Sequence, residues 1–217
     1  MIKIDLHTHS IASPDGGIKP EHYDRALESG QLDCIATTDH NTIDVACSLH
    51  DSLGKHIIVG EEITTTNGEL IGLFLKRSVA PRQSILATAQ AIKAQGGLVY
   101  IPHPFETLRK GVSEASLNQI AELVDIVEVH NGRAVFQNRS PQAAAWARMN
   151  RKAVAASSDA HGHKGLGGTY TLVAELPTAQ TLVKLLKKGR FVTNRPPLRT
   201  LLYPKIHRLH KRLSRTR

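Results

Sequence analysis

The sequence predicts an α/β fold in which strands and helices alternate around an incomplete or distorted barrel. Three observations support this prediction: eight short apolar runs, helical patterns between several of them, and polar residues that repeatedly follow the ends of the runs. Strands that alternate with helices of this length favour parallel βα units. With eight strands, a TIM-like barrel is a more natural arrangement than an open sheet.

The predicted strands are built mainly from aliphatic residues, because aromatic residues make up only 4% of the chain. They cover Ile2–Leu6, Cys34–Thr38, His56–Val59, Leu70–Leu75, Leu98–Ile101, Ile126–Val129, Ala153–Ala156 and Tyr170–Val173. The predicted helices cover Lys19–Ser29, Thr42–Leu53, Gln83–Gln95, Ser113–Leu123, Ala134–Asn150 and Thr178–Lys188. Three of these helices stop at a glycine, namely Gly30, Gly54 and Gly96, as is typical of helix C-termini.

The length of 217 residues and the lack of an internal repeat favour one domain with a short appendage. The composition changes at Pro196-Pro197, so we predict a domain over residues 1–195 and a basic tail over residues 196–217. The tail holds seven of the 28 Lys and Arg residues and no acidic residue, which leaves 21 basic against 19 acidic residues elsewhere. The net charge of +9 is therefore mainly a property of the tail.

The apolar runs are all too short to span a membrane, and the N-terminus lacks the basic-then-apolar order of a secretion signal. We therefore expect a cytoplasmic protein with no membrane partner. The only cysteines, Cys34 and Cys47, fall in a predicted strand and a predicted helix. This placement favours two buried, reduced thiols over a disulfide.

Polar residues follow the ends of six predicted strands. In barrels of this kind the active site forms where the strands end and the βα loops begin. The strand-end segments are His7-Thr8-His9, Asp39-His40, Glu61-Glu62, Pro102-His103-Pro104, His130-Asn131 and Ser157-Ser158-Asp159-Ala160-His161. A random scatter of polar residues would not place His, Asp or Glu at so many strand ends. The pattern therefore predicts a site at this end of the barrel.

The first strand predicts a metal site most directly. Side chains alternate along a strand, so His7 and His9 point to the same face. Two imidazoles on one face can bind a single ion such as Zn, Mn or Fe. An isolated His-x-His is nevertheless more typical of an exposed strand. Asp5 shares this face and is placed to orient a histidine from behind.

Taken singly, the other strand-end residues have ordinary explanations. Asp15 lies in a Ser-Pro-Asp-Gly-Gly turn, His40 precedes a predicted helix, and one of the paired glutamates is expected to be solvated. His103 is harder to explain in this way, because two flanking prolines hold it at a fixed place. Five histidines and several carboxylates together exceed the ligands that one ion needs. The number of ligands predicts two or three ions that share bridging carboxylates.

The ordered motifs resemble those of the PHP (polymerase and histidinol phosphatase) family. They are "DLHTHS…SPDGG", "TTDHNT", "GEEITT", "GELIGLFL", "IPHPF", "EVHNGR" and "SSDAHG", and the similarity covers roughly residues 1–195. The resemblance implies a distorted (β/α)₇ barrel with a di- or trinuclear centre of Zn, Mn or Fe that hydrolyses phosphate esters.

The resemblance also implies the ligands of this centre. They are His7, His9, Asp15, His40, Glu62, His103, Asp159 and His161. Many relatives have a histidine where this chain has Glu69, so we expect Glu69 to be a replacement ligand, the alternative being an exposed hairpin glutamate after the Asn67-Gly68 turn. His130 stands where similar sequences often have an apolar residue, and we expect it not to be a ligand. Arg133 resembles a family arginine near the substrate and is expected to bind phosphate oxygens.

The resemblance implies a phosphoesterase, and we expect it to act on phosphate monoesters of a small metabolite or nucleotide. The ions would activate water, and Asp159, His161 or His40 would supply a proton to the leaving group. The sequence has no Walker-type phosphate loop and no Gly-x-Ser-x-Gly. A rival enzyme is a nuclease that trims DNA or RNA ends and binds nucleic acid through the basic tail. The tail's Ile206, Leu209 and Leu213 would share one helical face, although a solvated helix or a disordered end is the simpler expectation. A non-enzymatic module that kept the barrel is a third alternative.

Overall fold

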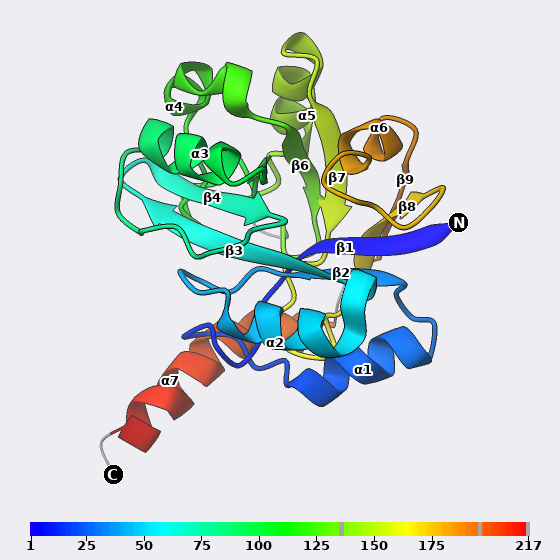
Figure 1. The fold of residues 1–217 in the computed structure, drawn as a ribbon. Coiled ribbons are helices and arrows are strands. Elements are labelled where there is room, and N and C mark those ends of the chain that lie inside the picture. Colours follow the sequence, from blue (N-terminus) through cyan, green and yellow to red (C-terminus); the bar gives the residue numbers. More distant parts are fainter. Residues whose placement is uncertain (135–136, 195–196, 216–217) are drawn as a thin grey trace.

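The computed structural model describes residues 1–134, 137–194 and 197–215, and its centre is a strongly curved nine-stranded sheet (Figure 1). The strands are β1 (Ile2–Thr8), β2 (Cys34–Thr37), β3 (Ile57–Thr65), β4 (Gly68–Leu73), β5 (Leu98–Ile101), β6 (Ile126–Asn131), β7 (Ala153–Ser157), β8 (Thr169–Val173) and β9 (Arg190–Thr193). Their order in the sheet is β7-β6-β5-β4-β3-β2-β1-β8-β9. A backbone bridge between Thr8 and Ala160 brings the end of β7 back to β1. The sheet therefore closes almost completely into a barrel, which confirms the predicted fold class.

Two runs of parallel strands meet at an antiparallel strand. β1, β2 and β3 are parallel to one another, as are β5, β6 and β7, but β4 is antiparallel to both of its neighbours. The prediction of parallel βα units is therefore wrong at β4. Its connection to β3 is a tight turn between Thr65 and Gly68, and a connection this short permits only an antiparallel pair. β8 also runs antiparallel, to β1 and to β9.

All eight predicted strands are present, and β9 is an addition. Its residues, Arg-Phe-Val-Thr, are exposed or half-buried, so they lack the apolar pattern of the other strands. The two glutamates, Glu61 and Glu62, were predicted to follow the end of the third strand. β3 in fact extends to Thr65, so both glutamates lie inside it.

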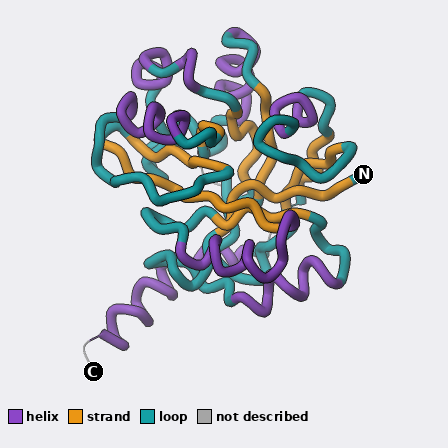
Figure 2. Tube along the Cα trace, viewed as in Figure 1, coloured by secondary structure: helices purple, strands orange, loops and turns teal. Residues whose placement is uncertain are grey.

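Helices cover the outside of the sheet (Figure 2). They are α1 (Pro20–Glu28), α2 (Asp44–Leu53), α3 (Ile85–Ala94), α4 (Glu114–Gln119), α5 (Ser140–Met149), α6 (Leu182–Leu186) and α7 (Tyr203–Arg215), with 3-10 turns at Gly54–His56, Ala121–Leu123 and Leu198–Leu202. Ser84 and Ser113 cap α3 and α4 by accepting backbone N–H groups, which explains where these helices begin. α5 begins later than predicted, with Pro141 in its first turn. Part of the predicted start, residues 135–136, lies outside the described residues.

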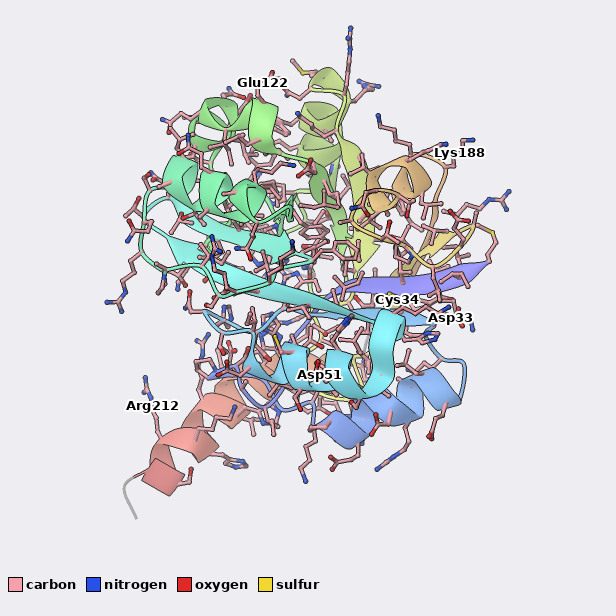
Figure 3. The ribbon with its side chains drawn as sticks, in the orientation of Figure 1. Asp33, Cys34, Asp51, Glu122, Lys188 and Arg212 are labelled. Carbon is pink, nitrogen blue, oxygen red and sulfur yellow. The ribbon has the colours of Figure 1, made fainter. Side chains whose placement is uncertain are left out.

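The apolar core fills the space between the sheet and the helices, and polar residues occupy one end of the barrel. On β1, Ile4 and Leu6 are buried in apolar clusters, while Asp5 and His7 are buried among polar groups on the other face. Cys34, on β2, is also buried (Figure 3), whereas Cys47, on α2, is only partly buried, so the prediction of two buried thiols is wrong for Cys47; both are free thiols. Within the described chain, no helix is long and apolar enough to cross a membrane.

The tail is helical and returns to the barrel. α7 begins beside the loops at the polar end and extends away from the body toward the C-terminus (Figure 1). Ile206, Leu209 and Leu213 are exposed on it, as the predicted helical face requires. The predicted domain boundary at residues 195 and 196 falls on residues outside those described, so the division of the chain stays a prediction.

Candidate metal centre

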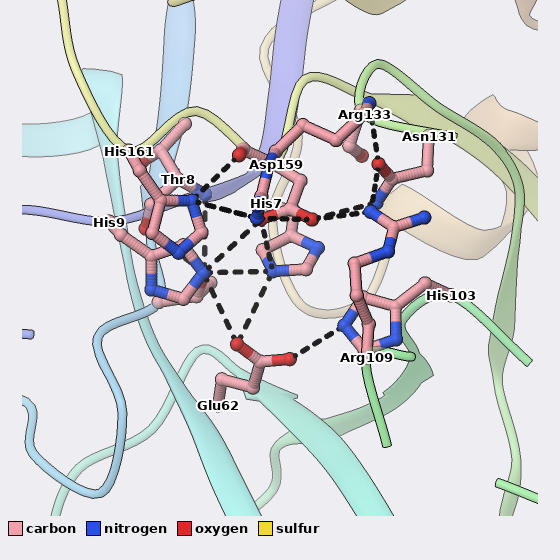
Figure 4. A network of polar contacts seen from close by, with 12 residues as sticks. His7, Thr8, His9, Glu62, His103, Arg109, Asn131, Arg133, Asp159 and His161 are labelled. Atoms are coloured by element: carbon pink, nitrogen blue, oxygen red, sulfur yellow. Dashed lines mark hydrogen bonds and ion pairs between the residues drawn. The ribbon is translucent and has the colours of Figure 1, made fainter. Parts of the chain in front are cut away.

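β1 places two imidazoles at the centre of the polar end of the barrel (Figure 4). His7 and His9 are buried, and their Nε2 atoms lie 3.1 Å apart. The ring of His7 is held from behind by Glu128 of β6, whose Oε1 lies 3.2 Å from His7 Nδ1. With a proton on Nδ1, the Nε2 lone pair of His7 faces the centre of the cluster.

Glu128, and not Asp5, is therefore the carboxylate that orients His7. Asp5 accepts hydrogen bonds from the backbone N–H groups of His7 and Ser158 instead. Glu128 also accepts hydrogen bonds from the Tyr100 hydroxyl at 2.9 Å and from Asn131 Nδ2 at 2.8 Å. Glu128 is the first residue of the EVHNGR motif but was not predicted as a site residue; a single glutamate inside the apolar run Ile-Val-Glu-Val is the signal that identifies it in retrospect.

A serine in the first loop holds His9 in the same way. The Ser13 hydroxyl lies 3.0 Å from His9 Nδ1 and donates to Asp39 Oδ1 at 2.7 Å. Because that hydroxyl proton points at Asp39, its oxygen is left to accept from His9 Nδ1–H. The Nε2 atom of His9 is then free to bind an ion.

Glu62 lies between four imidazoles, of which those of His7, His9 and His103 are labelled in Figure 4 and the fourth belongs to His40. Its Oε1 is 3.0 Å from His103 Nε2, and its Oε2 is 3.2 Å from His9 Nε2 and 3.3 Å from His40 Nδ1. Ligands on both oxygens are what a bridging carboxylate requires. The neighbouring Glu61 points to the other face of β3, where it accepts hydrogen bonds from Ser78 and Val79.

The loop after β7 brings in Asp159 and His161. Asp159 Oδ1 lies 3.6 Å from the Nε2 atoms of both His7 and His9, and 3.3 Å from His161 Nδ1. Asp159 and His103 both have a left-handed backbone, with φ of 50° and 51°. A non-glycine residue in this region costs about 1 kcal/mol or more, and such strain is concentrated at functional sites.

Asp15, His40 and Glu69 form the outer part of the cluster. Asp15 Oδ1 lies 3.6 Å from His40 Nε2 and 3.5 Å from His161 Nε2. Glu69 Oε1 lies 3.9 Å from His40 Nδ1. Glu69 is only 5% exposed, so it is not the exposed hairpin glutamate of the alternative reading.

The nine predicted ligands thus lie in one connected cluster. Their potential ligand atoms form four overlapping groups, and in each group these atoms all lie within 4.8 Å of one another. The groups are His9, Asp15, His40 and His161; His7, Glu62 and His103; His7, His9 and Asp159; and His40, Glu62 and Glu69. These groups contain all nine residues and no other described residue. His130 lies elsewhere, exposed and against the ring of Phe191.

Burial raises the pKa values of the acidic residues in the cluster, whereas nearby positive charges lower them. Burial alone would raise the pKa of Glu62, but His40 and His7 hold it well below its usual range. Burial likewise opposes ionisation of Asp159, whose pKa is nevertheless held well below its usual range by Arg133 and His7. Both carboxylates are therefore ionised at neutral pH.

The pKa values of Glu69 and His161 are shifted so that the uncharged form of each side chain is favoured. Burial, together with the negative charge of Glu62, raises the pKa of Glu69 to about 7. Burial and the neighbouring His9 lower the pKa of His161 to about 3, so this imidazole is neutral at pH 7. A neutral imidazole is the form that binds metal ions.

The donor set fits divalent ions. Asp15 Oδ1 and His103 Nδ1 are buried without a hydrogen-bond partner in the described structure, and Asp15 Oδ1 faces two imidazoles. Buried polar atoms normally have partners, so the unpaired Asp15 Oδ1, which faces into the cluster, indicates a bound group. Mixed imidazole and carboxylate donors suit Zn, Mn or Fe.

Two arginines extend the site toward solvent. Arg133 Nη1 lies 3.4 Å from Asp159 Oδ1 and 3.2 Å from His161 Nδ1, so this residue borders the ligand cluster, and its contact with a substrate stays a prediction. Arg109 was not predicted, although its Nη1 donates to Asp159 Oδ2 at 2.7 Å and also contacts Asn131. It lies in a loop without a recognisable motif, so only the folded chain identifies it.

A cavity of about 260 Å³ opens over the outer part of the cluster. It is lined by seven of the nine predicted ligands and by five cations, namely Arg109, Lys110, Arg133, Lys205 and Arg208. Two of these cations come from α7. The site therefore combines metal-type ligands with a positively charged wall.

The structure is thus a nearly closed α/β barrel with a candidate metal-binding cluster at its polar end. A PHP-associated family model matches residues 138–191. A protein of uncharacterised function from Methanocaldococcus jannaschii is 34% identical over 184 residues, which cover 81% of this chain and 72% of the relative. The chain belongs to the PHP family.

Solved structures share the fold. A two-domain protein from Bacteroides vulgatus, described as containing a predicted PHP-like metal-dependent phosphoesterase, has a TM-score of 0.71 at 22% identity, over 95% of this chain and 69% of its own. A lesion-specific endonuclease from Pyrococcus furiosus has a TM-score of 0.59 at 14% identity, over 88% of this chain and 57% of its own. The barrel is thus that of PHP-like metal-dependent phosphoesterases.

Proposed function

We propose that the protein is a metal-dependent phosphatase that hydrolyses phosphate monoesters of a small metabolite or nucleotide. The observation that supports this proposal best is the cavity, in which seven metal-type ligands face five cations. The nine clustered residues would hold two or three divalent ions of Zn, Mn or Fe. Bound there, such ions would supply Lewis-acid chemistry, lower the pKa of water and offset the charge of the phosphate.

The side chains around the cluster have separate tasks in this proposal. Arg133 and Arg109 would bind the phosphate oxygens, since both guanidinium groups line the cavity beside Asp159. Of the three predicted proton donors, Asp159 is ionised and His161 is unprotonated at neutral pH, so we assign the donation of a proton to the leaving alkoxide to His40. Of these three, His40 is the most exposed, with 17% of its side chain accessible, and it can exchange protons with solvent most readily.

The size of the cavity favours a small substrate. Pockets for drug-sized ligands usually measure roughly 300–1,000 Å³, and this cavity is slightly smaller. A phosphomonoester carries two negative charges near neutral pH, which the surrounding cations match. A long polymer would have to bind mainly outside the cavity.

The direct test is a panel of phosphate mono- and diesters assayed with Mn, Zn, Mg and Fe. We expect monoester hydrolysis that depends on a divalent ion and is abolished in His161→Ala. His130→Ala is the matched control, because His130 is exposed and lies outside the cluster. Wild-type turnover in His161→Ala would refute the proposed site.

A nuclease is the second candidate, and two observations favour it. The Pyrococcus furiosus protein with the same fold is an endonuclease, and the tail of this chain is strongly basic. A nuclease that uses the tail would bind single-stranded DNA with an affinity that falls steeply as salt rises. Charge reversal at the exposed tail residues Arg199 and Arg212 should weaken that binding, whereas a metabolite phosphatase should keep its kcat/KM.

Two results would favour the non-enzymatic alternative instead. They are fewer than two ions per chain and no phosphatase activity with any of the four metals. The cytoplasmic location also stays a proposal, which fractionation of the source cells would test.

A further inference from the structure

The loop that carries Asp15 is held by α7, nearly 200 residues further along the chain. The Lys211 ammonium donates hydrogen bonds to the backbone carbonyls of Ile11, Ser13 and Gly16. An ammonium has three N–H donors, so all of them are used on this one loop. The loop therefore wraps around a cation that belongs to the tail.

The same helix fixes the direction of the Asp15 carboxylate. Arg208 Nη2 donates to Asp15 Oδ2 at 2.6 Å, while Oδ1 faces His40 and His161. The Arg208 side chain is 58% exposed, so this ion pair adds little to the stability of the fold. Its effect is orientation, because one carboxylate oxygen is occupied and the other is turned toward the ligand cluster.

Two glycines in the site motifs leave room for the rings of α7. A Cβ atom on Gly17 would lie 2.2 Å from His207 Cε1, and one on Gly162 would lie 2.4 Å from Tyr203 Cδ2. Gly17 ends the Ser-Pro-Asp-Gly-Gly motif, and Gly162 follows His161. The two loops that carry Asp15 and His161 are thus shaped to accept this helix, which makes an accidental contact a poor explanation.

We propose that α7 is a built-in wall of the metal centre, in which Arg208 and Lys211 are positioning residues for Asp15 and its loop. This inference rests on the proposed metal centre. It also gives the tail a role that neither a solvated end nor a nucleic-acid-binding segment provides. Residues 203–211 then belong to the same functional unit as the barrel, and deletion of the tail would damage the site itself.

The test is metal binding by the full-length chain, because this readout does not require a known substrate. The metal-stripped protein is titrated with Mn²⁺ by calorimetry. Replacing a residue that orients a metal ligand typically lowers metal affinity by roughly 10–100-fold, and we expect a loss in this range for Arg208→Ala and Lys211→Ala. Arg208→Lys should recover part of the affinity, and Arg199→Ala, an exposed arginine in the same tail, should bind as the wild type does.

A steric variant gives an independent check. Gly162→Ala adds a methyl group where the Tyr203 ring lies, so α7 should shift and Mn²⁺ affinity should fall. A thermal melt shows whether each variant is folded, and a loss of affinity in a folded variant supports the inference. Wild-type affinity in Arg208→Ala, Lys211→Ala and Gly162→Ala would overturn it.

The outcomes also separate this inference from the proposed function. If the wild type binds ions and the variants bind them weakly, but no phosphate ester is hydrolysed, the inference stands and the phosphatase proposal fails. If the wild type hydrolyses monoesters and the variants keep normal metal affinity, only the inference fails. If the wild type binds no divalent ion, both fail.

Discussion

The inner and outer parts of the ligand cluster are built differently. The inner group is His7, Glu62 and His103, and each of these side chains is no more than 4% exposed. Two of them lie in strands, and the third sits at a strand end between two prolines. The outer group is Asp15, His40 and Glu69, which line the open cavity together with Glu62 and His103 of the inner group. Asp15 lies in a loop, and a distant helix holds it in place. Strands and a strand end thus fix the deep ligands locally, whereas the loop residue Asp15 in the outer group depends on a long-range contact.

The largest expected effect is at the deep end, with His7→Ala. We expect activity to fall by more than about 100-fold, since this change removes a ligand as well as the contact that orients it. The buried Glu128 would also lose one partner, at a cost of about 1–3 kcal/mol of unfolding free energy. Phosphomonoester hydrolysis and urea denaturation measure the two effects. An active, fully stable His7→Ala would show that the inner group is not essential.

Glu128→Gln tests the support behind the inner group. The substitution keeps the shape of the side chain but removes the charge that accepts from His7 Nδ1–H, so we expect Mn²⁺ affinity to fall by about 10–100-fold. Glu61→Gln is the matched control, because Glu61 is equally buried but faces away from the cluster. Calorimetric titration measures both variants. Equal affinity losses in the two would argue against a specific role for Glu128.

Glu69 should make the outer group sensitive to pH. With its pKa raised to about 7, Glu69 carries a proton over much of the range below pH 7, and an ion must displace that proton to bind there. Metal affinity should therefore increase as pH rises from about 6 to 8. Glu69→Gln cannot ionise, and it should flatten this increase while lowering the affinity at pH 8. An unchanged pH profile in Glu69→Gln would place Glu69 outside the metal site.

The smallest effect is expected on the exposed face of α7. The side chain of Leu209 is 57% exposed. Leu209→Ser should leave Mn²⁺ affinity and turnover within about twofold of the wild type, and the unfolding free energy within about 0.5 kcal/mol. A loss as large as that of Arg208→Ala would mean that α7 acts through its overall structure instead of through its two cations.

The difference between ligands fixed by local structure and residues held by distant segments explains which parts of the site the sequence could predict. Alternation along a strand puts His7 and His9 on one face, and barrel strands end on one side, so short local patterns bring these ligands together. The position of Glu69 can also be predicted from a local pattern, because the Asn67-Gly68 turn returns β4 beside β3. Glu128 was missed because a lone carboxylate in an apolar run has meaning only once His7 is known to face it.

Other parts of the site depend on contacts between distant segments. Arg109 and Arg208 have no sequence motif, and their roles come from Asp159 and Asp15, which lie far away in the chain. Gly17 ends the Asp-Gly-Gly turn, and only the folded chain shows that His207 fills the space beside it. Such fits between remote side chains leave no periodic trace in a single sequence.

Diffraction at the absorption edge of a bound metal tests the metal centre most directly. Crystals of the full-length chain grown with Mn²⁺ should show two or three anomalous peaks within the cluster, with Glu62 contacting two ions and Asp15 contacting the outermost one. Peaks confined to the inner group would leave the outer group without its proposed role. No peak among these nine residues would contradict the metal centre itself.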